Sequence, residues 1–133
     1  FFKKDTTTLQ KFVLRKNHSM SIRFYEKEKF TNLLYKIICE FLNYSKKKST
    51  IPFLLILPQI YDVEYFVKNK KCYYSNLISK FENQNAIIDI TPIFASKKNY
   101  RKYYINDKHG GHLSSIGNKI VAKEIEKKLN TIL

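Results

Sequence analysis

The fold class follows from the apolar stretch IPFLLILP, residues 51–58. Its apolar residues are continuous rather than alternating, and prolines stand near both ends. Such a run is typical of a parallel strand that is covered on both faces. A second short apolar run, AIIDI at residues 86–90, has the same character and is followed by Thr91 and Pro92. We therefore predict that the two segments pair as parallel strands of one sheet.

Helices are predicted before, between and after these strands. Residues 26–44 and 115–129 carry apolar side chains at the three-then-four spacing of a helix, and residues 65–81 follow it with some irregularity near Asn69. Ser114 is the expected N-cap of the last helix. Residues 1–23 show no clear period, and at most a short helix is expected around residues 9–14.

Strands that alternate with helices predict an α/β fold with right-handed parallel crossovers. The length of 133 residues fits one domain. Two strands are few for an open sheet. We therefore expect residues 1–133 to form a single domain whose sheet lacks strands that lie before Phe1.

The charge is strongly positive, because 25 basic and 11 acidic residues give a net charge of +14. Such a value invites a nucleic-acid interpretation. However, the basic residues are lysines except for Arg15, Arg23 and Arg101, and arginine is the residue suited to bidentate phosphate and base contacts. A solvated lysine surface is the preferred interpretation. No apolar run is long enough for a membrane-spanning helix, and no signal segment begins the chain.

Metal and cofactor chemistry is not expected. Cys39 and Cys72 are far apart, and neither lies near His109 or His112, so a zinc site is disfavoured. Cys39 sits in an apolar helical pattern and is expected to be a buried thiol. All three glycines fall between residues 110 and 117. The chain therefore has no P-loop, no dinucleotide-binding loop and no nucleophile elbow.

The segment most suited to chemistry is the glycine-containing loop before the last helix. It brings Asp107, His109 and His112 within six residues, and it follows the second strand. In open parallel sheets the active site lies outside the carboxyl ends of the strands. A histidine with a nearby carboxylate is a common general base. The alternative is a glycine-rich turn into a helix with two incidental surface histidines.

The run DKHGGHLSSIGNKIVA, residues 107–122, resembles the final block of the SGNH (GDSL-like) hydrolases. In that block an Asp and a His precede a terminal helix, with a Gly five residues after the His. His112, Gly117 and Ala122 match this pattern. The resemblance extends over residues 26–130, where residues 52–58 and 87–90 look like the late core strands of the family.

The resemblance implies a three-layer α/β/α, flavodoxin-like fold and ester hydrolysis or acyl transfer on a small-molecule or carbohydrate ester. It assigns His112 as the general base and Asp107 as its partner, with no cofactor. The usual spacing from Asp to His is three residues, whereas Asp107 stands five before His112 and His109 stands three before it. His109 is therefore an alternative base.

No serine of the chain has the setting of the family nucleophile, since none before residue 110 has a glycine neighbour. We expect the C-terminal part of such an enzyme, inactive alone. Two other classes stay open. One is a basic module that binds nucleic acid or another polyanion through lysines and exposed tyrosines such as Tyr100, Tyr103 and Tyr104. The other is a degenerate domain that kept the fold and lost the chemistry.

Overall fold

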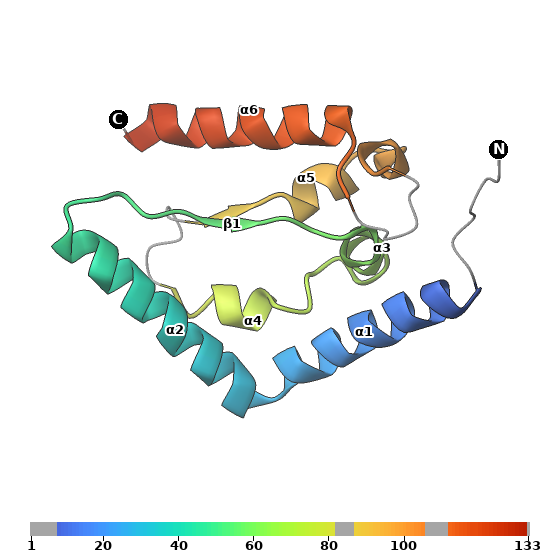
Figure 1. Ribbon diagram of the computed structural model, residues 1–133, viewed down its shortest axis with the longest axis horizontal. Coiled ribbons are helices and arrows are strands. Elements are labelled where there is room, and N and C mark those ends of the chain that lie inside the picture. Colours follow the sequence, from blue (N-terminus) through green and yellow to red (C-terminus); the bar gives the residue numbers. More distant parts are fainter. Residues whose placement is uncertain (1–7, 82–86, 106–111, 133) are drawn as a thin grey trace.

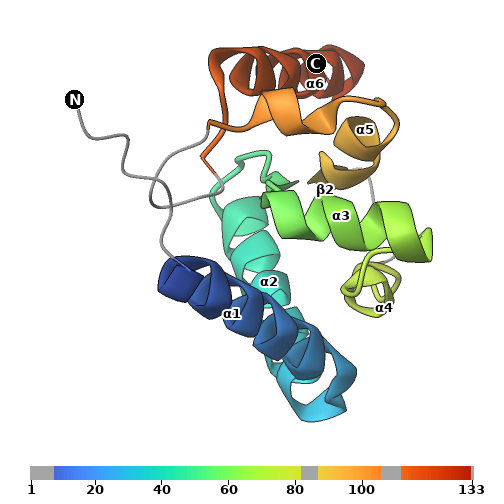
Figure 2. The same cartoon turned by 90° about the vertical axis from the view of Figure 1, so that its right-hand side faces the viewer.

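The computed structural model describes residues 8–81, 87–105 and 112–132, and these residues are mostly helical. The elements, in chain order, are α1 (Thr8–Glu26), α2 (Glu28–Lys47), β1 (Leu54–Ile56), α3 (Ile60–Asn69), α4 (Ser75–Ile78), β2 (Ile87–Asp89), α5 (Thr91–Ala95), the 3-10 helix η2 (Tyr100–Tyr103) and α6 (Ser115–Ile132). Two views show α5 and α6 on one side of the strands, and α1, α2 and α4 on the other (Figures 1 and 2).

The two strands pair in parallel, as the apolar runs predicted. Leu54 lies opposite Ile87, and Ile56 lies opposite Asp89. The ladder continues by one hydrogen bond, from the Ile90 N–H to the Ile56 carbonyl, at 3.2 Å. Each strand is three residues long. Prolines limit the length of both strands. Pro52 and Pro58 flank β1, and Pro92 lies in the first turn of α5, directly after β2.

The predicted three-layer, flavodoxin-like sheet is wrong for this chain. In the part of the chain that the structure describes, the sheet has two short strands, and the other regular elements are helices. The physical reason is that residues outside the two apolar runs carry helical or irregular patterns, so nothing else in the described segments can extend the ladder.

The first helix is much longer than the sequence indicated. Residues 8–26 form α1, although no residue of this helix is fully buried. The chain then bends at Lys27, and α2 begins at Glu28. The Lys27 N–H donates to the Phe24 carbonyl at 3.2 Å, which closes the bend. Together α1 and α2 form a V beneath the strands (Figure 1).

The helix predicted over residues 65–81 is in fact two helices, so this prediction is wrong in its extent. The first, α3, begins earlier with a capping box in which the Gln59 and Asp62 side chains each satisfy a backbone N–H of the other. It ends at Lys70, which takes a left-handed conformation with φ of 59°. A turn then leads to α4.

The core lies between the strands and the helices α3, α5 and α6. Val63, Ile90 and Phe94 are completely buried. The rings of Phe94 and Tyr103 lie 4.8 Å apart between centroids. Tyr103 and Tyr104 are themselves buried, so the expectation of exposed tyrosines is wrong at these two positions. Tyr100 is half-buried.

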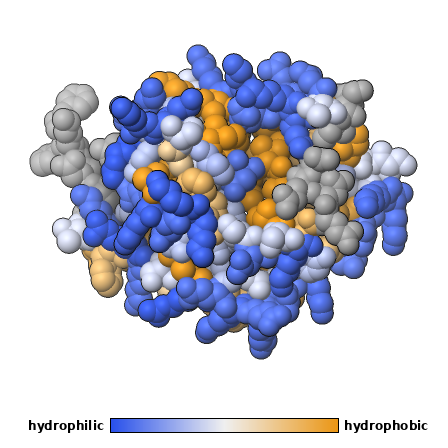
Figure 3. All heavy atoms as spheres, turned by 180° about the vertical axis from the view of Figure 1, so that it is seen from behind, coloured by the Kyte–Doolittle hydropathy of each residue, from blue (hydrophilic) through white to orange (hydrophobic). Residues whose placement is uncertain are grey.

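Apolar side chains also remain at the surface, above all on α1 and α2. The stripe expected to be the buried face of α2 is partly exposed: Phe30, Leu33, Ile37 and Phe41 each keep at least 39% of their surface accessible. Figure 3 shows apolar surface between hydrophilic side chains on one face of the molecule. The structure therefore combines a modest core with a surface that is both basic and partly apolar.

Candidate functional site

His112 lies in the short stretch just before α6. Backbone hydrogen bonds join this stretch to residues at the end of η2 and just after it. Tyr104 and Leu113 form an antiparallel bridge, and the Ile105 N–H donates to the His112 carbonyl at 2.9 Å. Ser114, two residues after His112, caps α6, because its hydroxyl accepts from the Gly117 N–H at 3.2 Å. The predicted cap is confirmed. The His112 residue is exposed to solvent.

This stretch is joined to the carboxyl end of β1. The buried Tyr104 hydroxyl donates to the Pro58 carbonyl at 2.8 Å, and Pro58 is the second residue after β1. Burial raises the pKa of Tyr104, and Asp62 adds to the effect. The phenol is therefore a neutral hydrogen-bond donor at any ordinary pH. Ile105, which follows Tyr104, donates to the His112 carbonyl, so the His112 stretch is connected through Tyr104 to the segment just after β1.

Gly117 is required by close packing between α6 and η2. A side-chain carbon at this position would lie within 3.0 Å of the Tyr103 carbonyl oxygen and 3.2 Å from the carbonyl carbon. That same oxygen accepts from the Ser114 N–H at 2.7 Å. The glycine five residues after His112 therefore allows the helix that follows the histidine to approach η2 closely.

The other predicted site residues lie outside the described residues. These are Asp107 and the alternative base His109. Whether Asp107 partners His112 stays a prediction.

A second polar site was missed by the sequence analysis. A cavity of about 270 Å³ lies beside the carboxyl end of β1 and between α1 and α3. Its lining residues are Leu14, Asn17, His18, Ser21, Leu57, Gln59, Asp62 and Tyr73. His18 and Asp62 are 44 positions apart in the chain, and no local spacing links them. We call this the His18 cavity.

Asp62 is the most constrained group in the His18 cavity. Its Oδ2 accepts from the Gln59 N–H at 2.7 Å, and its Oδ1 accepts from the Tyr73 hydroxyl at 2.9 Å. The His18 Nε2 lies 3.3 Å from the same Oδ1. Burial, followed by the charge of Asp62, raises the pKa of Tyr73 strongly. Tyr73 therefore stays a neutral donor to the carboxylate.

The imidazole of His18 is enclosed by aromatic rings. The ring centroids of Tyr61, Tyr65 and Tyr73 lie 5.6 to 6.2 Å from it. Its Nε2 is buried and makes no hydrogen bond with the described residues, despite its closeness to Asp62. A buried polar atom without a hydrogen bond is uncommon in native proteins.

Ser21 lines the same cavity, but it is not arranged as a nucleophile. Its hydroxyl donates to the Asn17 carbonyl one turn earlier, at 3.1 Å, which is a common way to satisfy a helical serine. His18 and Ser21 share α1, and no hydrogen bond joins them in the described part of the chain. The cavity thus holds an acid, a histidine and a hydroxyl without the relay that a triad needs.

A third set of polar side chains, hydrogen-bonded around Asp89, has a structural role. The Tyr74 hydroxyl lies 3.0 Å from both carboxylate oxygens of Asp89 and 2.6 Å from the Thr91 hydroxyl. The Asp89 Oδ1 also accepts from the Thr91 N–H, at 2.9 Å. The Cys72 Sγ lies 3.8 Å from Oδ2. Burial raises the pKa of the Cys72 thiol to about 11. This network fastens the turn before α4 to the end of β2.

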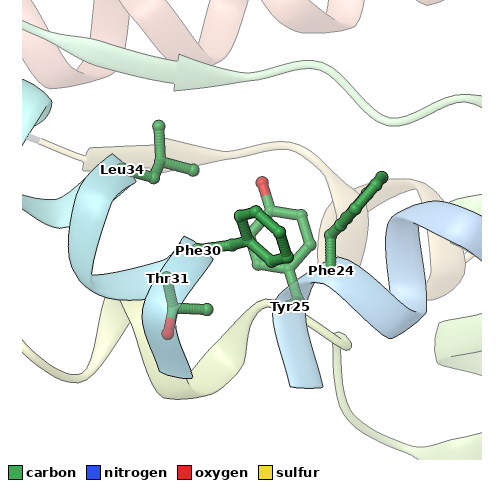
Figure 4. Close-up of a pocket in the computed structure, with 5 residues that line it drawn as sticks. All are labelled: Phe24, Tyr25, Phe30, Thr31 and Leu34. Carbon is green, nitrogen blue, oxygen red and sulfur yellow. The ribbon is translucent and has the colours of Figure 1, made fainter. Parts of the chain in front are cut away.

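A small apolar pocket lies in the bend between α1 and α2. Its volume is about 120 Å³, and its lining residues are Phe24, Tyr25, Phe30, Thr31 and Leu34. Figure 4 shows these side chains gathered at the elbow. The rings of Phe24 and Phe30 meet edge to face, with centroids 5.0 Å apart. The pocket offers hydrophobic contact and little polar chemistry.

Neither cysteine of the described chain is in a disulfide; Cys72 is buried, whereas Cys39, expected to be buried, is half-buried. The described residues contain no cluster of three or more His, Cys, Asp or Glu side chains suited to a metal ion. Within those residues no helix is both long and apolar enough to cross a membrane.

Comparison of the chain with protein-family models, curated proteins and solved structures found no match.

Proposed function

We propose that this chain supplies His112 as the general base of a serine-dependent ester hydrolase or acyltransferase, with Asp107 as the partner of the imidazole. The observation that carries the proposal is the position of His112. The residue is exposed and lies two positions before Ser114, the N-cap of α6. Its carbonyl accepts from the Ile105 N–H, and the neighbouring Tyr104 is hydrogen-bonded to Pro58, just after β1. The resemblance of residues 107–122 to the SGNH block supports the same role.

The chemistry assigned to His112 is proton transfer. The imidazole would take the proton of a serine hydroxyl while the serine oxygen forms a bond to the acyl carbon. It would then return that proton to the departing alcohol as the ester bond breaks. A carboxylate on the other ring nitrogen fixes the tautomer and stabilises the protonated ring. No serine of these 133 residues has the required setting, so the proposal places the nucleophile elsewhere in the gene product.

The burial of Tyr103 and Tyr104 weighs against the polyanion alternative. Binding of single-stranded nucleic acid depends on aromatic rings on which bases can stack. Tyr103 is 3% exposed and Tyr104 is 8% exposed. The lysine surface remains, but the stacking surface that the sequence indicated is largely absent at these two residues.

A fluorophosphonate probe tests the proposal without knowledge of the substrate. Such a probe labels an activated serine, because the serine oxygen displaces fluoride from phosphorus while the base takes the hydroxyl proton. We expect the complete gene product to be labelled, and His112→Ala to slow labelling by about 1,000-fold or more, as loss of a triad member does.

The matched control is His109→Ala, which should label at nearly the rate of the unchanged protein. The isolated 133-residue chain should not be labelled. A complete gene product that resists the probe, or a His112→Ala variant that labels normally, would show the proposal to be wrong. Labelling of the isolated chain itself would place a nucleophile within these residues and contradict the assignment of roles.

A further inference from the structure

The His18 cavity has a chemical character opposite to that of the chain as a whole. The molecule carries 25 basic and 11 acidic residues. Yet the cavity is lined by one carboxylate, that of Asp62, and no lysine or arginine stands among its described lining residues. Its other polar groups are neutral amides and hydroxyls and the imidazole of His18. An anionic ligand would therefore meet like charge inside the cavity.

The hydrogen-bonding capacity of the cavity suits hydroxyl groups. A hydroxyl can donate to the Asp62 carboxylate and can accept from an amide such as that of Asn17. Leu14 and Leu57 provide apolar contact for carbon–hydrogen groups. A cavity lined by both polar and apolar residues fits a ligand that is polar at its edges and apolar on its faces.

The volume of the cavity limits the size of the ligand that it can hold. At about 270 Å³ the cavity has room for roughly nine water molecules. It lies just below the usual range of about 300 to 1,000 Å³ for drug-sized ligands. We propose that the His18 cavity binds a neutral, hydroxyl-rich ring of the size of one monosaccharide.

The position of the cavity gives this ligand a place in the reaction. Leu57 and Gln59 both line the cavity. Between them, the Pro58 carbonyl accepts a hydrogen bond from the Tyr104 hydroxyl, which anchors the His112 stretch. The proposed sugar would thus lie beside the segment after β1 to which the His112 stretch is connected through Tyr104. Its identification as part of the ester substrate rests on the proposed function, whereas the binding itself does not.

The test compares neutral and anionic sugars on the present chain. Methyl glycosides of glucose, galactose, mannose and N-acetylglucosamine are titrated against the ¹⁵N-labelled protein, with sodium glucuronate as the anionic ligand at the same ionic strength. Non-specific attraction to a +14 protein would favour glucuronate. We expect the reverse: at least one neutral glycoside shifts the amide signals of Asn17, Ser21 and Gln59, and it binds at least fivefold more tightly than glucuronate.

Two variants connect that binding to the cavity. Asn17→Ala removes an amide from the lining of the cavity and should weaken the neutral glycoside at least threefold. Asn118→Ala removes an exposed amide from α6 and should leave binding unchanged. Binding of none of the four glycosides, a preference for glucuronate, or equal effects of the two variants would overturn the proposal. Because probe labelling needs no sugar, failure of this inference is distinguishable from failure of the proposed function.

Discussion

Replacement of Gly117 by alanine tests the packing that positions the His112 stretch. The added methyl carbon would lie within 3.0 Å of the Tyr103 carbonyl oxygen and 3.4 Å from the Leu113 Cβ. The oxygen is backbone and is held by the Ser114 N–H at 2.7 Å, so it cannot easily move away. Overpacking of this kind costs about 1 to 3 kcal/mol. Because the contact is against fixed backbone, we take the upper end, about 3 kcal/mol.

The same substitution also favours the helix, and this effect must be subtracted. Alanine is preferred over glycine in a helix by about 1 kcal/mol. The expected net loss in the free energy of unfolding for Gly117→Ala is therefore about 2 kcal/mol. The measurement is urea denaturation followed by circular dichroism at 222 nm.

The control for this experiment is Asn118→Ala, at the next position of α6. Asn118 is exposed, so only the helix preference changes, and the stability should stay equal or rise by about 0.5 kcal/mol. If Gly117→Ala is as stable as the unchanged protein or more stable, then the close approach of α6 to η2 does not exist in solution, and the described placement of His112 loses its support.

Three further outcomes are expected from the buried groups. Because burial raises the pKa of Cys72 to about 11, its thiol should react with iodoacetamide at pH 8 at least 100-fold more slowly than a free cysteine, and mass spectrometry should find Cys39 modified first. Tyr104→Phe should lower the free energy of unfolding by about 1 to 3 kcal/mol, because it removes the hydrogen bond to the Pro58 carbonyl; an unchanged urea midpoint would contradict that bond. Burial raises the pKa of Tyr74 above its usual value of 10, so the stability it contributes is present below pH 10 and is lost as the pH rises further; tyrosinate absorbance at 295 nm that titrates fully near pH 10 without unfolding would refute this.

The parallel strand pair could be predicted because both strands are local and continuous in the sequence. Residues 51–57 and 87–90 are apolar runs bounded by prolines, and their pairing follows from the helices between them. The break at Lys70 could not be predicted in the same way. No glycine or proline marks it, and a lysine in the left-handed region carries no reliable sequence signal.

The two candidate sites differ in the same way, because local sequence predicts one of them and not the other. His112 was singled out because Asp107, His109, His112 and Gly117 lie close together in the sequence. The His18 cavity was missed because Asp62 caps α3 while His18 lies on α1, whose apolar residues face solvent and obscure its period. Tyr103 and Tyr104 were expected at the surface because lysines and arginine precede them. Their burial depends on Phe94 and Pro58, which no local pattern connects to them.

The apolar side chains exposed on α1 and α2 have a consequence for how these molecules behave together. Two copies whose Leu33 and Ile37 surfaces meet would remove hydrophobic area from water, which favours association. Each copy also carries a charge of +14, and this repulsion opposes contact over about 10 Å at 0.1 M salt but only about 3 Å at 1 M. Because salt shortens the range of this repulsion, we expect the tendency of the protein to associate with itself to rise with ionic strength.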